Sequence, residues 1–222
     1  MSKEIWTAVE HYYGGLLAPD DAVLERALQS SEAGGLPRIQ VSALQGKLLY
    51  LLARMISARN ILEIGTLAGY STIWMARALP EDGRLITLET SEKHAEIARE
   101  NFAHAGLTGK IVLRLGKALD TLPEIAAEGR GPFDFIFIDA NRSNQPEYFD
   151  WSLKLARPGS VIVVDNVVRE GAVLNFESGD ADIQGTRRFA EMAAAEKRVS
   201  STVIQTVGSK NYDGFAILLV TA

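Results

Sequence analysis

The chain has 222 residues, 47% of them hydrophobic and 23% charged, with a formal net charge of −5 and no cysteine. This composition is typical of a single soluble domain, disfavours nucleic acid as a partner, and excludes disulfide bonds, thiolate metal sites and a cysteine nucleophile. Because no apolar run approaches the roughly 20 residues of a membrane span and the chain shows no signal-peptide pattern, we expect a cytoplasmic protein.

Residues 1–58 are predicted to form helices that precede a sheet. An amphipathic pattern covers residues 5–17 and is expected to end near Gly14–Gly15. A proline followed by two acidic residues favours the start of a second helix. Ser42 suits an N-cap, so a third helix is predicted over residues 43–57.

From residue 60 onward, runs of β-branched and aliphatic residues alternate with helical patterns. The runs predicted as strands are residues 60–65, 83–89, 110–116, 133–139 and 159–165. The predicted helices are residues 70–79, 92–105, 118–128, 146–155 and 183–197. Such alternation indicates a parallel sheet with helices on both faces. Two further runs around a turn-rich segment, residues 208–214, predict a hairpin that adds an antiparallel strand.

The predicted fold is therefore α/β, with a seven-stranded, mostly parallel sheet. We expect one domain over residues 1–222, divided into a helical segment, 1–58, and a core, 59–222. Acidic residues lie at or near the ends of four predicted strands: Glu63, Glu89, Asp139 and Asp165. Because ligands bind at the carboxyl ends of the strands in such sheets, we expect a binding site at this edge.

The stretch ILEIGTLAGYS combines a strand, a glycine turn and the start of a helix. Gly65 suits the tight turn, and Gly69 lets the helix begin close to the strand. Leu67 occupies the position of the second glycine in a dinucleotide-binding turn, which argues against NAD or FAD. Glu89 ends the next strand, 24 residues after Gly65, where an acid binds ribose hydroxyls in related folds. The structural alternative is a turn needed only for packing, with Glu89 as a solvated strand end.

Several separated motifs resemble those of class I S-adenosylmethionine-dependent methyltransferases. The motifs are ILEIGTLAGYSTIWMARALP, LITLE, FIFIDANR and VIVVDNVVREG. Together they are similar to the small metal-dependent O-methyltransferases typified by catechol and caffeoyl-CoA O-methyltransferases, especially the bacterial members. The resemblance extends from about Ile39 to the C-terminus. It implies a Rossmann-like methyltransferase fold, a homodimer, and methyl transfer from S-adenosylmethionine to a hydroxyl of a small, catechol-like aromatic substrate.

The resemblance also implies where S-adenosylmethionine binds. Glu63, Gly65 and Ser71 are expected beside its methionine part, and Glu89 is expected to bind both ribose hydroxyls. The segment GKALDTL is expected to lie beside the adenine. The full set of expected cofactor residues is Val41, Glu63, Gly65, Ser71, Glu89, Gly116, Ala118 and Asp139.

Asp139, Asp165 and Asn166 are expected, from the same resemblance, to hold a divalent metal ion. They offer only oxygen donors, which suit Mg²⁺ first, with Ca²⁺ or Mn²⁺ as substitutes. In the implied reaction, two neighbouring phenolic hydroxyls bind the metal, which lowers a hydroxyl pKa. The structural alternative is that the two aspartates cap helices or pair with Arg142 and Arg169.

Arg142 is the main departure from the family pattern. The family places a lysine three residues after the first metal aspartate, in a pattern like D-A-D-K, whereas this chain has Asn141 and Arg142 at the last two positions. Arginine stays protonated and cannot act as a general base at neutral pH, so we assign Arg142, with Asp139, to the catalytic set as a charge stabiliser. Activation by the metal alone and deprotonation by Lys210 both remain open.

Three other functions are alternatives. A tRNA-modifying methyltransferase of the same fold is disfavoured by the acidic charge and the lack of a basic stripe. A nicotinamide-dependent oxidoreductase is disfavoured by Leu67. A catalytically inactive protein that binds S-adenosylmethionine is suggested only by Arg142. The three histidines, His11, His94 and His104, lack metal-ligand spacing and are assigned no role.

Overall fold

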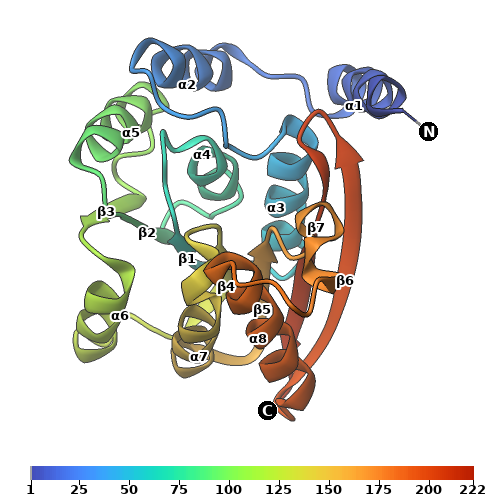
Figure 1. Ribbon diagram of the computed structural model, residues 1–222. Coiled ribbons are helices and arrows are strands. Elements are labelled where there is room, and N and C mark those ends of the chain that lie inside the picture. Colours follow the sequence, from blue (N-terminus) through green and yellow to red (C-terminus); the bar gives the residue numbers. More distant parts are fainter. Residues whose placement is uncertain (1) are drawn as a thin grey trace.

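The computed structural model describes residues 2–222 and contains one seven-stranded sheet (Figure 1). The strands are β1 (Asn60–Ile64), β2 (Arg84–Glu89), β3 (Ile111–Leu115), β4 (Phe133–Ile138), β5 (Ala156–Asp165), β6 (Val199–Gly208) and β7 (Asn211–Val220). Their spatial order is β3-β2-β1-β4-β5-β7-β6. The first five strands are parallel, and β7 runs antiparallel to both β5 and β6. The prediction of a mostly parallel sheet closed by an antiparallel C-terminal strand is confirmed.

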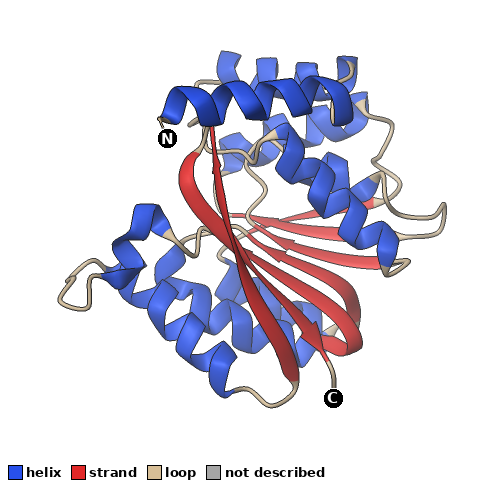
Figure 2. Ribbon diagram, turned by 90° about the vertical axis from the view of Figure 1, so that its right-hand side faces the viewer, coloured by secondary structure: helices blue, strands red, loops and turns tan. Residues whose placement is uncertain are grey.

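Helices cover both faces of this sheet, as Figure 2 shows. The helices are α1 (Lys3–Leu17), α2 (Ala22–Ala33), α3 (Ala43–Met55), α4 (Tyr70–Ala76), α5 (Glu92–His104), α6 (Ala118–Ala127), α7 (Gln145–Leu155) and α8 (Ala181–Ala195). Two short 3₁₀ helices, η1 (Arg142–Asn144) and η2 (Arg169–Leu174), follow β4 and β5. Figure 1 places α3, α4 and α5 on one face and α6, α7 and α8 on the other.

The alternation of side chains along β4 explains the two layers. Phe135 and Phe137 join the apolar cluster under α3, α4 and α5, whereas Ile136 and Ile138 join the cluster under α6, α7 and α8. All four side chains are fully buried. A strand buried on both faces in this way is the reason that its sequence is a nearly continuous apolar run.

The N-terminal helices largely follow the sequence signals. Ser42 caps α3 in a capping box with Gln45, whose backbone N–H donates to Oγ of Ser42 at 3.4 Å while its side chain accepts from the N–H of Ser42 at 2.8 Å. The predicted end of the first helix near Gly14–Gly15 is wrong, because α1 continues to Leu17. A glycine inside a helix costs only about 1 kcal/mol, which does not suffice to end it.

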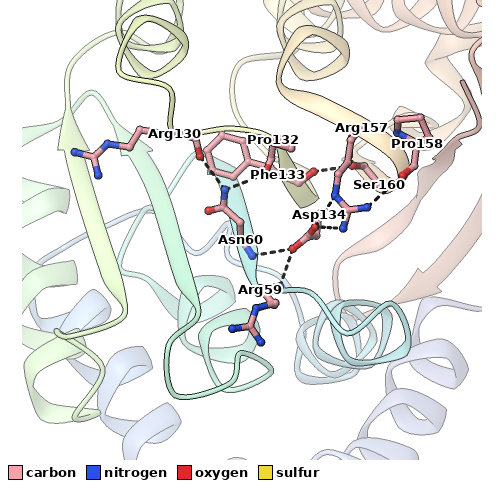
Figure 3. Close-up of polar contacts among 9 residues, drawn as sticks. All are labelled: Arg59, Asn60, Arg130, Pro132, Phe133, Asp134, Arg157, Pro158 and Ser160. Carbon is pink, nitrogen blue, oxygen red and sulfur yellow. Dashed lines mark hydrogen bonds and ion pairs between the residues drawn. The ribbon is translucent and has the colours of Figure 1, made fainter.

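Asp134 fixes the strands at the sheet edge opposite the expected site, and Figure 3 shows its contacts. Its Oδ2 accepts from the backbone N–H groups of Arg59 and Asn60 at 2.8 and 3.0 Å, and its Oδ1 accepts from Nε of Arg157 at 3.1 Å. Burial raises the pKa of Asp134, but these hydrogen bonds and the Arg157 charge outweigh burial and lower it. The carboxylate thus ties the starts of β1, β4 and β5 together.

Within residues 2–222, no helix combines the length and the apolar character that a bilayer crossing requires.

Candidate active site

A cavity of about 710 Å³ opens at the carboxyl ends of β1, β2 and β4. Its wall contains nearly every residue expected to bind the cofactor: Val41, Gly65, Ser71, Glu89, Gly116, Ala118 and Asp139. These residues come from separate loops that the parallel sheet brings to one edge. Glu63 is the one expected cofactor residue that does not line the cavity.

The turn between β1 and α4 forms the floor of this cavity. Gly65 has a φ of 103°, and a Cβ there would overlap the carbonyl oxygen of Asp139. Gly69 has a φ of 85°, and a Cβ there would overlap the ring of Phe102. Both positions therefore require glycine, for the close approach that the sequence pattern predicts. Leu67 also has a positive φ, 52°, which is strained for a residue with a side chain.

Glu89 holds this strained turn and faces the cavity. Its Oε2 accepts from the backbone N–H of Leu67 at 2.8 Å, and its Oε1 accepts from the N–H groups of Thr90 and Ser91 at 2.8 and 2.9 Å. The side chain is buried but lines the cavity wall. A carboxylate fixed by three backbone donors is a preorganised acceptor, as the expected contact with two ribose hydroxyls requires.

Glu63 lies one layer behind the cavity wall, beneath α4. Its carboxyl group is fully buried and accepts hydrogen bonds from the hydroxyls of Ser71 and Thr87, each at 2.6 Å, and from that of Thr72. Burial raises the pKa of Glu63 to about 7, although these three hydroxyls act in the opposite direction. Its contact with the cavity is therefore indirect, through Ser71.

A second cavity, of about 690 Å³, lies beside the first. Asp165 and Asn166, at the end of β5, line this second cavity, and Asp139, after β4, lines the first. Arg142 lines both. The three predicted metal ligands therefore surround the boundary between two cavities, one of which contains the expected cofactor residues.

The pKa values of the two aspartates at this boundary are raised. Burial raises the pKa of Asp139 to about 6, with the charge of Arg142 opposing the shift and that of Asp213 adding to it. Burial also raises the pKa of Asp165 well above its usual range, and the charge of Asp139 adds to that effect. Asp165 is buried and the side chain of Asp139 is 20% exposed, and a cation beside two neighbouring carboxyl groups favours their ionised forms.

Arg142 supplies part of this charge. One of its terminal nitrogens donates a hydrogen bond to Oδ1 of Asn166 and lies 3.9 Å from Oδ1 of Asp139. Its Nε is buried and has no hydrogen-bond partner among the described residues. The structural alternative in which Asp139 pairs with Arg142 is thus realised as a long ion pair. Asp165, by contrast, forms no ion pair with Arg169 within residues 2–222, and its Oδ1 accepts from the N–H of Asn166 at 2.7 Å.

The oxygen donors fit a hard divalent cation by their chemistry. Two carboxyl groups and one amide line the two neighbouring cavities, and the charge of Asp139 raises the pKa of Asp165 in addition to burial. No group of three or more His, Cys, Asp or Glu side chains in residues 2–222 has a metal-binding arrangement, and the third donor expected here is an amide. The site therefore depends on how Asn166 is oriented.

Lys210 also reaches the second cavity from the hairpin between β6 and β7. Its Nζ donates to the carbonyl oxygen of Arg38 at 3.0 Å. Burial lowers the pKa of Lys210, while the negative charges of Glu10 and Asp139 oppose the shift. The amine that the sequence offered as an alternative base therefore stands near the site.

His94 and Tyr148 line the first cavity, although the sequence assigned them no role. Nδ1 of His94 lies 3.5 Å from Oε1 of Glu89. The side chain of Ser91 caps α5, which puts His94 in the first turn after β2 and hence at the ligand-binding edge. His94 could have been identified from the sequence, because it lies three residues after Ser91, the N-cap of the helix that follows β2. Tyr148 donates its hydroxyl to Oδ1 of Asn141, a contact across a turn that the sequence does not signal.

Comparison with known proteins identifies the family of this chain. The sequence model of the O-methyltransferase family matches residues 17–217, which is most of the chain. The chain belongs to this O-methyltransferase family. This result confirms the predicted family and the predicted Rossmann-like fold, and it makes the protein an S-adenosylmethionine-dependent O-methyltransferase.

Individual relatives agree over the whole chain. A catechol O-methyltransferase of Niastella koreensis is 52% identical over 220 residues, covering 99% of this chain and 100% of that protein. A catechol O-methyltransferase of Mycobacterium tuberculosis is 50% identical over 212 residues, covering 96% and 94% of the two chains.

Solved structures show the same likeness in three dimensions. An O-methyltransferase from Bacillus cereus in complex with SAH has a TM-score of 0.98 and 56% identity, covering 99% of this chain and 100% of that one. The O-methyltransferase TomG from Streptomyces achromogenes, in complex with SAM, has a TM-score of 0.97 and 52% identity, with 100% of both chains covered. The fold and the enzyme class thus rest on close relatives.

Proposed function

We propose that the enzyme transfers the methyl group of S-adenosylmethionine to one hydroxyl of a small vicinal diphenol. The observation that carries this proposal is the group of oxygen donors from Asp139, Asp165 and Asn166 at the boundary between two cavities. One cavity contains the expected cofactor residues, and the other leaves room for an aromatic substrate. The names of the two catechol O-methyltransferase relatives support the substrate class.

The same three residues would hold the divalent metal ion, with Mg²⁺ as the first choice. When bound, such an ion supplies positive charge that holds two neighbouring phenolic oxygens and lowers the pKa of a hydroxyl. Asp139 and Asp165 contribute the negative charge, and the burial of Asp165 strengthens its attraction for a cation. Asn166 contributes a neutral oxygen.

The chain's own residues would orient the cofactor in the first cavity. Glu89 lines this cavity and is held by three backbone donors, and we assign it to the ribose hydroxyls. Gly65, Ser71 and the segment from Gly116 to Ala118 line the same cavity; we assign the first two to the methionine part and the segment to the adenine. This arrangement would fix the methyl group at the boundary between the cavities, which favours an in-line approach of the substrate oxygen.

Arg142 is proposed to stabilise the negative charge that develops on the attacking oxygen. Its guanidinium lies beside Asp139 and Asn166 and lines both cavities, so it stands where the reacting groups would meet. An arginine guanidinium is not a general base at neutral pH, so Arg142 is not proposed to remove the proton. Lys210, whose pKa is lowered by burial, is the alternative proton acceptor.

We also propose that the enzyme is a homodimer and that α1 contributes to the contact. No residue of α1 is buried, and its apolar side chains Val9, Tyr12, Leu16 and Leu17 are 50%, 64%, 62% and 61% exposed. Soluble proteins seldom leave such a row of apolar side chains uncovered. A second copy of the chain would cover it.

The substrate class is tested with a set of matched phenols and labelled S-adenosylmethionine. Catechol should be methylated, whereas resorcinol, whose hydroxyls are not adjacent, and guaiacol, which has lost one hydroxyl, should react at least 100-fold more slowly. Equal rates for catechol and guaiacol would show that the enzyme does not use a vicinal pair. Mass spectrometry of the products gives the readout.

A further inference from the structure

The carboxyl group of Asp213, in β7, is the hydrogen-bond partner of the loop that follows β5. Its Oδ1 accepts from the backbone N–H groups of Val168 and Arg169, each at 3.0 Å, and from that of Gly214 at 2.9 Å. Its Oδ2 accepts from Nδ2 of Asn166 at 3.2 Å. Four N–H donors thus converge on one carboxyl group, three of them on Oδ1 and one, from Asn166, on Oδ2.

This loop contains Asn166, the predicted metal ligand whose orientation is least obvious. Asn166 has a φ of 60°, in the left-handed region, and Arg169 has a φ of 56°. Such residues lie in a conformation that L-amino acids with side chains rarely adopt, so the loop needs contacts that hold it. Asp213 supplies contacts on both sides of the strained segment, to Asn166 and to Arg169.

Two partners of opposite kind fix the direction of the Asn166 amide. Asp213 offers acceptors to it, so the amide turns its Nδ2 toward β7. Arg142 has only donors, and its guanidinium donates to the other end, Oδ1. The amide oxygen therefore faces the boundary between the cavities, where Asp139 and Asp165 lie.

We infer that Asp213 is a positioning residue that turns the amide oxygen of Asn166 toward the cation site, an inference that rests on the proposed metal-supported function. In this inference Asp213 acts through Asn166: its Oδ1 is held by three backbone N–H groups, and its Oδ2 accepts from Nδ2 of Asn166. Groups that orient metal ligands typically change metal affinity by 10- to 100-fold when they are altered. Asp213 does not line the cofactor cavity, so its effect should be selective for the metal.

The substitution Asp213→Asn tests this role, because it replaces one carboxylate oxygen by an NH₂ group and keeps the shape of the side chain. The new amide can keep its oxygen toward the three backbone N–H groups, but its Nδ2 then meets Nδ2 of Asn166. Two donors cannot pair, so the amide of Asn166 should turn around and present its N–H groups to the cation. Affinity for Mn²⁺, measured by electron paramagnetic resonance of the free ion, should fall about 10- to 100-fold.

The double variant Asn166→Asp/Asp213→Asn puts the carboxylate at position 166 and the amide at position 213. A donor and an acceptor then face each other again. Asp at position 166 accepts from the new amide at 213 and still presents an oxygen to the cation, so Mn²⁺ affinity should return to at least the wild-type value. Calorimetry with S-adenosylhomocysteine should give affinities within 2-fold in all three proteins. Thermal unfolding checks that each variant is folded.

The outcomes separate this inference from the function on which it rests. If the wild-type enzyme does not bind Mn²⁺, the proposed metal function fails. If it binds Mn²⁺ and Asp213→Asn binds equally well, the function stands and the positioning role is overturned. A folded double variant with the weak affinity of Asp213→Asn would also overturn it. Loss of folding in both variants would do the same, because Asp213 would then be needed for the fold rather than for the direction of the amide.

Discussion

The terminal guanidinium nitrogen of Arg142 lies 3.9 Å from Oδ1 of Asp139, so a fixed positive charge already stands beside the first predicted metal ligand. The same group donates a hydrogen bond to Oδ1 of Asn166. A divalent ion that binds there must displace this hydrogen bond and tolerate a neighbouring cation. Arg142 is thus expected to weaken metal binding while it supports the reaction.

Arg142→Ala should separate these two effects. Removal of the guanidinium charge should increase Mn²⁺ affinity several-fold, since like charges within a buried site repel. Turnover should nevertheless fall at every pH, because the charge that stabilises the attacking oxygen is lost. The pKa of Asp139 should rise further, since Arg142 opposes the effect of burial on it. Metal titration and steady-state rates across pH 5 to 10 check both parts.

Arg142→Lys should change the pH profile rather than remove the function. In the wild-type enzyme no lysine stands at position 142, so turnover should be slow near pH 7 and rise toward alkaline pH. A lysine amine in this pocket can lose its proton, so the variant should be faster near neutrality and its profile should move to lower pH. Lys210→Ala is the control. If that variant is inactive while Arg142→Ala equals the wild type, the base lies in the hairpin and our assignment is incorrect.

Glu89→Ala should weaken cofactor binding by roughly 1.5–3 kcal/mol, the range for hydrogen bonds to a charged group. This corresponds to a loss of about 10- to 150-fold in the affinity for S-adenosylhomocysteine. The strained turn at Leu67 also loses an acceptor, so thermal unfolding must be recorded alongside. Glu89→Gln is the matched control, since it keeps the shape and one acceptor oxygen. Calorimetric affinity of the alanine variant equal to that of the wild type would remove Glu89 from the cofactor site.

Much of the fold could be predicted from the sequence, because the parallel strands are rich in apolar residues and because β4 and β5 are nearly continuous apolar runs with an aspartate after or at their end. The positions of Glu89, Asp139 and Asp165 followed directly from the ends of the predicted strands. Glu63 is a different case, because it lies inside β1 rather than after it. It shares a face with Ile61, beneath α4, and pairs in register with Thr87, so its carboxyl group points into the layer behind the cavity.

Side-chain contacts between segments that are far apart in the chain could not be predicted from the sequence. Asn166 and Asp213 are brought together only because β7 inserts between β5 and β6, with Asp165 opposite Phe215. No local pattern encodes that register. The direction of the Arg142 side chain is likewise set by the amide of Asn166, whose orientation depends on Asp213.

Glu63 should make the free energy of unfolding depend on pH between about 4.5 and 7. Its pKa is 4.5 in the unfolded chain and about 7 in the folded protein, chiefly because of burial. Between these values the folded state keeps a proton that the unfolded state has lost, so stability falls as pH rises. The loss is roughly 3 kcal/mol when complete, since one pKa unit corresponds to about 1.4 kcal/mol. Denaturant titrations with EDTA present, from pH 4 to 8, give the measurement.

Glu63→Gln is the comparison for this prediction. Glutamine keeps the shape and one of the two acceptor oxygens, which can still accept from Thr72 and Thr87, but it does not titrate. The difference in stability between wild type and variant should therefore shift in favour of the variant as pH rises through this window. A difference that stays constant from pH 4 to 8 would mean that Glu63 does not change its protonation on folding.

Light scattering of the wild-type protein should give the mass of a dimer. Leu16→Glu/Leu17→Glu should shift the population toward the monomer, because charged side chains on an apolar contact face are costly to bury. Both positions are more than 60% exposed, so the double substitution should leave the fold of the monomer intact. A wild-type protein of monomer mass would contradict the dimer, and a dimeric double variant would place the contact elsewhere than α1.

The most direct measurement of the central claim is methyl transfer to catechol after removal of divalent ions. With EDTA present, product should fall to background, and excess Mg²⁺ should restore it. Asp165→Ala should stay inactive even with Mg²⁺, while calorimetry shows that it still binds S-adenosylhomocysteine, because Asp165 lies outside the cofactor cavity. Full activity of the wild-type enzyme in thoroughly chelated buffer would contradict the claim that Asp139, Asp165 and Asn166 act by holding a metal ion.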